Sequence, residues 1–510
     1  MKTATAYDIW LSGFTRGKVR ATDVLALVGL CAAYFVLRLV RLRSFPVFND
    51  EGIYIEWAKS ALADPNLRFI SLTDGKQPLQ TWLTIPFLRL LPGDSVLASR
   101  LVAVLSGCVT LVGIFVLVNT ISSRRAAWYG AALYVFAPYF LFYDRLALVD
   151  SAVNASVVWI FCLSILLART RRLDVALLLG IVGGTATLTK SSVIMFIGLL
   201  VTTPLLCTGS DARQLWKRRA HCLLLLGLCY AFIYLISRVQ RLSPYAENIA
   251  NKNYTFILTP AEFIANPFSC FRVNILRVPQ LVAHEFGYLA AAFGILGAVK
   301  LYKKNRRIAL YFALWIFVPF VVVLFITKDP YPRYLIFFAS WVCVLAAVFI
   351  GSLSRRLKTL GVLVVFVSFA YADYAIILDP ARLPFPKVDR TQYVEGWSSG
   401  WGIESVLEIA RAEAKQKPVM LLAEGDFGMA RDVLRASLRP SDTNISVEGR
   451  YPLDEAAITS ALDMWLDKTV LVVFVHSSSF PSHWPLRLLA RFDKPGGQSS
   501  MFVHRLTRDR

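Results

Sequence analysis

The chain consists mainly of long apolar runs separated by short polar segments. A helix that crosses a membrane needs about 20 mostly apolar residues. Eleven segments reach or approach that length: 24–40, 97–119, 126–142, 146–168, 174–189, 191–207, 219–237, 282–299, 307–326, 333–351 and 358–378. The pattern therefore predicts a multi-span α-helical membrane protein with eleven transmembrane helices.

The pattern changes after residue 379. Short apolar runs typical of strands alternate there with helical patterns, the former at 419–423, 470–476 and 500–503 and the latter at 405–414, 429–438 and 454–466. This alternation predicts a small α/β domain with a mainly parallel sheet. Pro380, Pro384 and Pro386 mark a linker, so we divide the chain into a membrane domain, 1–378, and a soluble domain, 379–510.

Basic residues are distributed unequally between the two sides of the membrane that this span order defines. The inner segments, from the N-terminal tail onward, hold 21 Lys and Arg residues, whereas three short outer turns hold four. Positively charged loops stay in the cytoplasm. We therefore expect a membrane protein with a cytoplasmic N-terminus. Its outer pieces would be the loops 42–96 and 238–281 and the C-terminal domain.

The composition excludes other classes of protein. Of 510 residues, 56% are hydrophobic and 17% are charged, against about 25% charged residues in soluble domains. The net charge of +21 would suit a nucleic-acid binder, but the charges cluster between apolar runs, so no nucleic-acid partner is predicted. The eight Cys include no CxxC pair and the five His show no metal-ligand spacing. Neither a disulfide framework nor a metal site is therefore predicted.

The first outer loop contains two adjacent carboxylates, Asp50 and Glu51. Moving a carboxylate out of water at a membrane costs free energy, so we expect these two to have a function or a partner that compensates. An Asp at this boundary can accept a proton from a hydroxyl nucleophile. The alternative interpretation is a helix start, in which Asn49 or Asp50 caps a helix over 54–62 and the helix dipole favours the acids. The two interpretations are compatible.

Charged residues also occupy the other outer turns. Lys76 precedes an apolar helix, where it can bind a phosphate at headgroup level or extend its ammonium group to the interface. Acids and cations follow in three later turns: Asp144, Arg145 and Asp150, then Lys190, then Arg333. A local ion pair could equally close the first of these turns. A phosphodiester or pyrophosphate on a lipid needs such a set of cations, so the turns together predict a lipid-phosphate site.

The order of these motifs is itself informative. Asp50-Glu51 follows the first span, and later come Lys76-x-Pro78-Leu79 before Trp82, Arg145-Leu-x-x-x-Asp150, Leu188-Thr189-Lys190 and Arg333-Tyr334-Leu335. Over residues 20–378 this order resembles the GT-C superfamily of integral membrane glycosyltransferases. It is most similar to bacterial protein O-mannosyltransferases of glycosyltransferase family 39 and to the lipid A aminoarabinose transferase. The stretch 392–402 looks like an appendage of some bacterial members.

The resemblance implies a specific chemistry. A sugar would pass, with inversion, from a polyprenyl-phosphate donor to an acceptor hydroxyl at the outer face of the membrane. Asp50 would deprotonate the acceptor and Glu51 would support it, while Lys76 and Arg333 would bind the carrier phosphate. The acceptor would be a glycan, a glycolipid or a protein. Some relatives use a divalent cation, but no residue spacing here requires one.

Other residues of the outer turns would assist in this scheme. Lys190 and Arg145 would add to the phosphate-binding cations, and Asp144 and Asp150 would be supporting acids. The family often has Pro where this chain has Gln77, which predicts a looser turn next to Lys76.

A transporter or flippase for lipid-linked sugars is the alternative function. Such a protein would also have many spans and buried charges, together with an inverted internal repeat and charges near the middle of the membrane. The sequence shows no repeat, and its unusual charges lie at the outer ends of the spans. We therefore predict the glycosyltransferase.

Inverting transfer needs one base and a stabilised leaving group, whereas a retaining enzyme needs two carboxylates about 5 Å apart.

Overall fold

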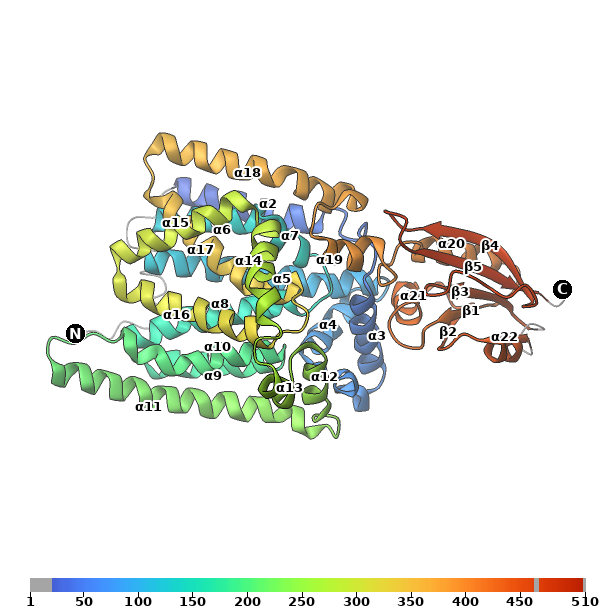
Figure 1. Ribbon diagram of the computed structural model, residues 1–510, viewed down its shortest axis with the longest axis horizontal. Helices are drawn as coiled ribbons and strands as arrows, with labels where there is room; N and C mark the ends of the chain where they lie inside the picture. The colour runs from blue at the N-terminus through green and yellow to red at the C-terminus, as the bar shows by residue number, and fades with distance from the viewer. Residues whose placement is uncertain (1–20, 463–466, 508–510) are drawn as a thin grey trace.

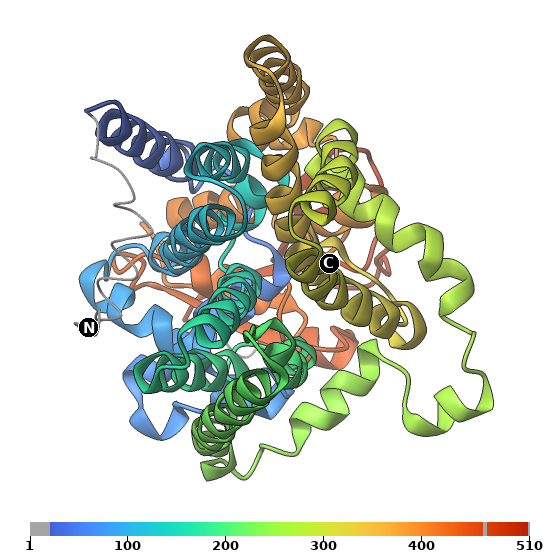
Figure 2. The same cartoon turned by 90° about the vertical axis from the view of Figure 1, so that its left-hand side faces the viewer.

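The computed structural model describes residues 21–462 and 467–507, so the basic residues of the tail 1–20 lie outside the described part. A long helical bundle makes up most of the molecule, and a sheet domain lies against one end of it (Figure 1). Seen along the bundle, the helices appear end-on with the sheet domain behind them (Figure 2).

Each of the eleven predicted spans falls on helical structure. The bundle contains α2 (Ala21–Leu39), α5 (Ser95–Ile121), α6 (Arg124–Phe136), α7 (Pro138–Tyr143), α8 (Asp150–Thr170), α9 (Leu173–Thr187), α10 (Ile194–Leu199), α11 (Ala212–Ser237), α14 (Phe271–Phe286), α15 (Tyr288–Lys304), α16 (Arg306–Ile326), α17 (Ile336–Ser352) and α18 (Arg355–Leu378). Within the described residues, six helices are long and apolar enough to cross a membrane, or seven if one bent pair counts as a span. The count of eleven spans therefore stays a prediction.

Local backbone chemistry explains why some apolar runs are not single helices. The run 126–142 breaks before Pro138, which opens α7 and cannot donate a backbone hydrogen bond to α6. The run 282–299 bends by 110° between α14 and α15. The bend lies at Gly287, whose φ of 97° is a conformation that residues with a side chain rarely adopt.

The loops 42–96 and 238–281 fold into short helices, the first at the end of the bundle that faces the sheet domain and the second along the side of the bundle (Figure 1). The first loop forms α3 (Asn49–Ala63), η1 (Pro65–Leu67), η2 (Ile70–Asp74) and α4 (Leu79–Leu90), and the second forms η5 (Arg238–Leu242), α12 (Asn248–Phe256) and α13 (Pro260–Ala265). Helix α3 begins at Asn49, earlier than predicted. Neither Asn49 nor Asp50 is its N-cap, because the cap position belongs to Phe48.

The C-terminal region contains the predicted α/β domain, with a mixed rather than a mainly parallel sheet. After η7 (Pro380–Arg382), α19 (Lys387–Arg390) and the π-helix η8 (Thr391–Glu395) come α20 (Ile403–Glu413), β1 (Val419–Glu424), α21 (Arg431–Ser437), β2 (Ile445–Arg450), α22 (Glu455–Leu462), β3 (Thr469–Phe474), β4 (Leu486–Asp493) and β5 (Ser500–Leu506). The strand order is β2-β1-β3-β5-β4. Strand β1 pairs in parallel with β2 and β3, whereas β5 is antiparallel to β3 and β4.

The antiparallel pairing of β4 with β5 has a simple origin. Strands β4 and β5 form a hairpin, and consecutive strands joined by a short connection can only run antiparallel. Both β2 and the largely exposed edge strand β4 were absent from the prediction, because their polar residues interrupt the apolar pattern. The last four residues of the predicted helix 454–466 lie outside the described part.

The sheet domain packs directly on α3. A Cβ atom on Gly52 would lie 2.6 Å from the side chain of Val433 and 2.9 Å from its backbone, so only glycine allows this approach of α3 and α21. Lys59 donates to the carbonyl oxygen of Arg435 at 2.7 Å, and Glu56 pairs with the Arg435 guanidinium at 3.2 Å. The C-terminal domain thus fixes the helix that carries Asp50.

Candidate active site

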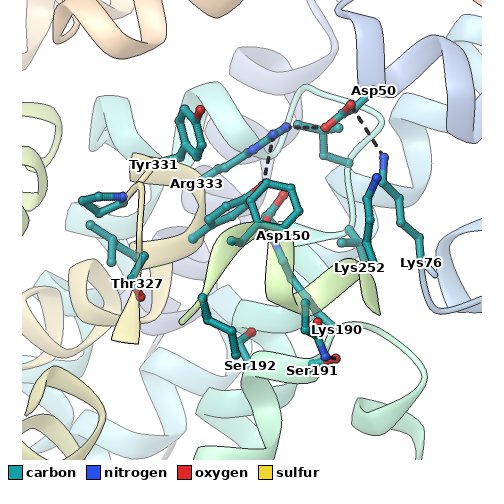
Figure 3. Close-up of a pocket in the computed structure, with 18 of the residues that line it drawn as sticks. Asp50, Lys76, Asp150, Lys190, Ser191, Ser192, Lys252, Thr327, Tyr331 and Arg333 are labelled. Carbon is teal, nitrogen blue, oxygen red and sulfur yellow. Dashed lines mark hydrogen bonds and ion pairs between the residues drawn. The ribbon is translucent and has the colours of Figure 1, made fainter. Parts of the chain in front are cut away.

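Asp50 lies in a cavity of about 530 Å³ where the bundle, the outer loops and the C-terminal domain meet. Its carboxylate contacts the Arg333 guanidinium at 2.9 Å and the Lys76 ammonium at 3.6 Å. The Asn49 amide donates to the same carboxylate at 3.2 Å. Three charged side chains that are far apart in the sequence therefore point toward one another (Figure 3). The predicted grouping of Asp50, Lys76 and Arg333 matches this geometry.

The electrostatic surroundings of Asp50 keep it ionised. Burial acts to raise the pKa of its carboxyl group, but the positive charges of Lys76 and Arg333 outweigh burial and hold the pKa well below its usual range. A carboxylate with so low a pKa is a weak base. Its basicity would increase if another anion took over the two cations.

A second ion pair lies beside the first in the same cavity. Lys190 donates to Asp150 at 2.8 Å and lies 3.7 Å from the centre of the Tyr334 ring. Arg333 donates to the Tyr334 hydroxyl at 3.3 Å, so this ring separates the two cations. Burial lowers the pKa of Lys190, and Asp150 partly opposes that effect.

Side-chain hydrogen bonds hold the turn that carries Lys76 at Gln77, the position before Pro78. Gln77 donates to the Ser191 hydroxyl at 2.7 Å, and Asn253 donates to the same oxygen at 3.0 Å. Gln77 thus ties the Lys76 turn to the turn of Lys190, and the departure from the family motif is compensated by these hydrogen bonds.

The lining of the cavity combines a cationic end with an apolar wall. Among the described residues that line it are four cations, Lys76, Lys190, Lys252 and Arg333, and two carboxylates, Asp50 and Asp150. Apolar side chains of other elements complete the lining, among them Met195, Phe256, Val322, Val323 and Ile326. The cavity therefore suits a ligand with an anionic group and an apolar chain.

Glu51 lies outside the cavity, although it is adjacent to Asp50 in the sequence. Its carboxylate is fully buried and accepts hydrogen bonds from Arg100 at 2.8 and 2.9 Å. It also accepts from the backbone N–H groups of Phe48 at 3.0 Å and Ala147 at 2.7 Å. With these bonds Glu51 connects the start of α3 to α5 and to the turn before α8.

Arg145 and Asp144 also face the bundle, contrary to the expectation that they contribute to the phosphate site. Arg145 donates to carbonyl oxygens at the C-terminal end of α2, at 2.7 to 3.1 Å. The last carbonyls of a helix lack partners within it, which explains this position. Asp144 pairs with Arg38 at 3.3 Å and accepts from Ser151 at 2.8 Å.

The sequence analysis did not identify three further cavity residues. Lys252 reaches the cavity from α12 and pairs with Asp74 at 2.7 Å. Gln392 and Trp397 come from the start of the C-terminal region. The only available signal was the Trp-, Gly- and Ser-rich composition of the stretch 392–402. In the described part of the chain, no group of three or more His, Cys, Asp or Glu residues could hold a metal ion.

Comparisons with known proteins show a similar fold. Residues 75–236 match the family model of dolichyl-phosphate-mannose-protein mannosyltransferases. The structure is similar to ArnT from Cupriavidus metallidurans bound to undecaprenyl phosphate, with 16% identity, a TM-score of 0.60 and coverage of 96% of this chain and 99% of that one. The apo state of the same protein gives 16% identity, a TM-score of 0.59 and coverage of 94% and 97%.

A second solved structure is similar to this chain with a lower TM-score. The apo oligosaccharyltransferase of Archaeoglobus fulgidus gives 12% identity and a TM-score of 0.51, with coverage of 88% of this chain and 69% of that one. The sequence matches no curated protein. The predicted resemblance is therefore confirmed at the level of the fold, which is ArnT-like, and residues 75–236 match the mannosyltransferase family model.

Proposed function

We propose that this protein is an inverting glycosyltransferase that moves a sugar from a polyprenyl phosphate to an acceptor hydroxyl at the outer face of the inner membrane. One observation carries the proposal: Asp50 lies between Arg333 and Lys76 in a cavity with a cationic end and an apolar wall. A base next to two phosphate-binding cations is the minimal equipment for this reaction.

In the proposed reaction Asp50 takes the proton of the acceptor hydroxyl. The acceptor oxygen then attacks the anomeric carbon, and the bond from that carbon to the phosphate oxygen breaks with its electron pair staying on the phosphate. Arg333 and Lys76 stabilise the negative charge that develops there. Glu51 faces Arg100 outside the cavity and cannot serve as the second carboxylate of a retaining mechanism, and Asp150, the other carboxylate of the cavity, is engaged by Lys190 at 2.8 Å.

The same two cations make the basicity of Asp50 depend on whether the donor is bound. Before the donor binds, Arg333 and Lys76 hold the pKa of Asp50 low and make it a weak base. A donor phosphate that recruits both cations removes this effect, and the pKa of Asp50 rises toward its usual range. Asp50 therefore becomes an effective base only when the donor is in place. The ArnT structure with undecaprenyl phosphate supports a lipid-phosphate ligand for this fold.

Removal of Lys76 should weaken donor binding. Lys76→Ala deletes one cation of the phosphate site, and hydrogen bonds to charged groups contribute about 1.5–3 kcal/mol, so affinity for undecaprenyl phosphate should fall at least about tenfold. The measurement is ligand titration of the detergent-solubilised chain by native mass spectrometry. Lys415→Ala, at an exposed position in the C-terminal domain, is the matched control and should bind normally. Equal affinity of all three proteins would contradict the phosphate site.

Asn49 should set the pH dependence of the reaction. Its amide donates to Asp50 and helps keep the pKa of that carboxyl low. Asn49→Ala raises this pKa, so protonation of the base begins at higher pH. The acid limb of kcat for transfer, measured at saturating donor where the phosphate has taken over Lys76 and Arg333, should therefore move up by about one pH unit. The exposed Asn66→Ala is the control. A uniform loss of rate with an unshifted limb would mean that Asn49 has only a structural role.

A further inference from the structure

One wall of the cavity is built by the C-terminal region. Gln392, Trp397 and Ser398 line the cavity there. The Asn49 N–H donates to the Ser398 carbonyl at 3.0 Å, which brings this wall to the residue that precedes Asp50. A molecule that enters along the wall therefore arrives next to the proposed base.

The loop 396–399 in this wall is held by a single buried lysine of the sheet domain. The Lys494 ammonium, 2% exposed, donates to the carbonyl oxygens of Gly396 at 3.0 Å, Trp397 at 2.9 Å and Ser399 at 2.8 Å. The remaining carbonyl of the loop, on Ser398, accepts from Asn49. All four carbonyl oxygens thus have partners within the chain. A peptide, which is recognised largely through backbone hydrogen bonds, would find the carbonyl oxygens of this loop already engaged.

The side chains of the wall, in contrast, are available to a ligand. The Trp397 ring is 47% exposed. Both amide atoms of Gln392 are buried and lack a hydrogen-bond partner. A buried polar group without a partner is costly, and a ligand that pairs with it removes that cost. The wall therefore offers an aromatic face next to an amide that can donate and accept.

Two further rings extend this aromatic face away from the cavity. His476 lies 4.7 Å from Trp397 and 6.4 Å from Tyr451, measured between ring centres. His476 follows β3 and Tyr451 follows β2, so both lie at the carboxyl ends of parallel strands, where α/β sheets bind ligands. Glu424 fixes the loop by accepting the His476 N–H at 2.7 Å. The Tyr451 side chain is exposed.

We propose that Trp397, Gln392, His476 and Tyr451 form the acceptor subsite, and that the acceptor is a carbohydrate. A sugar ring has apolar C–H faces and a rim of hydroxyl groups. The faces match the aromatic rings, and the rim matches the Gln392 amide. A first sugar on Trp397 presents a hydroxyl to Asp50, and the rest of the glycan follows His476 and Tyr451. This inference rests on the proposed glycosyltransferase function.

The test compares two water-soluble probes on the full chain loaded with undecaprenyl phosphate. The probes are the deacylated core oligosaccharide of a lipopolysaccharide and a Ser/Thr-containing peptide of similar mass, observed by saturation-transfer NMR. We expect the oligosaccharide to bind and the peptide not to bind. Trp397→Ala and Gln392→Ala should each weaken oligosaccharide binding about tenfold. Trp397→Phe should retain most of it, because a ring remains.

Controls separate this inference from the function on which it rests. Trp216→Ala removes an exposed Trp of α11 far from the cavity and should change nothing. Tyr451→Ala, at an exposed residue that does not line the cavity, should weaken oligosaccharide binding and leave undecaprenyl phosphate binding unchanged. Oligosaccharide binding that is absent from wild type, or unchanged in Trp397→Ala, overturns the inference, as does binding of the peptide alone. If wild type does not bind undecaprenyl phosphate, the proposed function itself fails.

Discussion

Asp50→Asn is expected to abolish sugar transfer while the protein still inserts, folds and binds its donor. The amide is nearly isosteric with the carboxylate but cannot accept the acceptor proton, and general-base catalysis contributes about 10²–10⁴-fold. The substitution also removes the anion that Arg333 and Lys76 contact. Affinity for undecaprenyl phosphate should therefore stay equal or increase while turnover is lost.

Loss of turnover in Asp50→Asn together with unchanged or tighter donor binding would identify Asp50 as the base. Turnover can be followed in cells by mass spectrometry of envelope glycans, with the wild-type gene, the variant or no gene present. Asp329→Asn is the matched control, because Asp329 is exposed and does not line the cavity. Near-normal glycan modification by Asp50→Asn would show that another group takes the proton. Weaker donor binding would show that Asp50 holds the phosphate site together.

Glu51→Ala is expected to destabilise the fold. The Glu51 carboxylate is fully buried and accepts four hydrogen bonds, two of them from the buried Arg100. Its removal leaves the Arg100 charge uncompensated in the interior, and breaking a buried pair in this way costs about 3–5 kcal/mol. The detergent-solubilised variant should unfold at a clearly lower temperature, measured by intrinsic fluorescence, and yield less monodisperse protein.

The comparison with Asp50→Asn distinguishes structural from chemical roles for these neighbours. Asp50→Asn should lose turnover with a smaller fall in unfolding temperature than Glu51→Ala, because the Asp50 side chain is 21% exposed whereas Glu51 is fully buried, and Glu51→Ala should lose stability while its folded fraction retains turnover. Leu in place of both Glu51 and Arg100 removes both charges and should recover part of the lost stability. A Glu51→Ala protein with wild-type stability but no turnover would assign Glu51 to the chemistry.

The sequence predicted the helical segments and much of the candidate site for clear reasons. Transmembrane helices must satisfy their own backbone hydrogen bonds in an apolar solvent, so their composition alone reveals them. Asp50, Lys76, Lys190 and Arg333 were identified because unusual charges at the ends of apolar runs are visible in one dimension. Lys252, Gln392 and Trp397 were missed, because their loops have polar compositions that are typical of any exposed connection.

The alternation of apolar and polar residues determined by itself that this chain forms membrane helices followed by an α/β domain. It also placed a set of charges at the ends of those helices. Only the tertiary structure decided which charges meet. Consecutive helical residues point about 100° apart, so Asp50 and Glu51 must face different surroundings, and packing of α3 on Arg100 and on α21 turns Asp50 into the cavity. Contacts between residues far apart in the sequence determine this orientation, and local sequence patterns do not reveal such contacts.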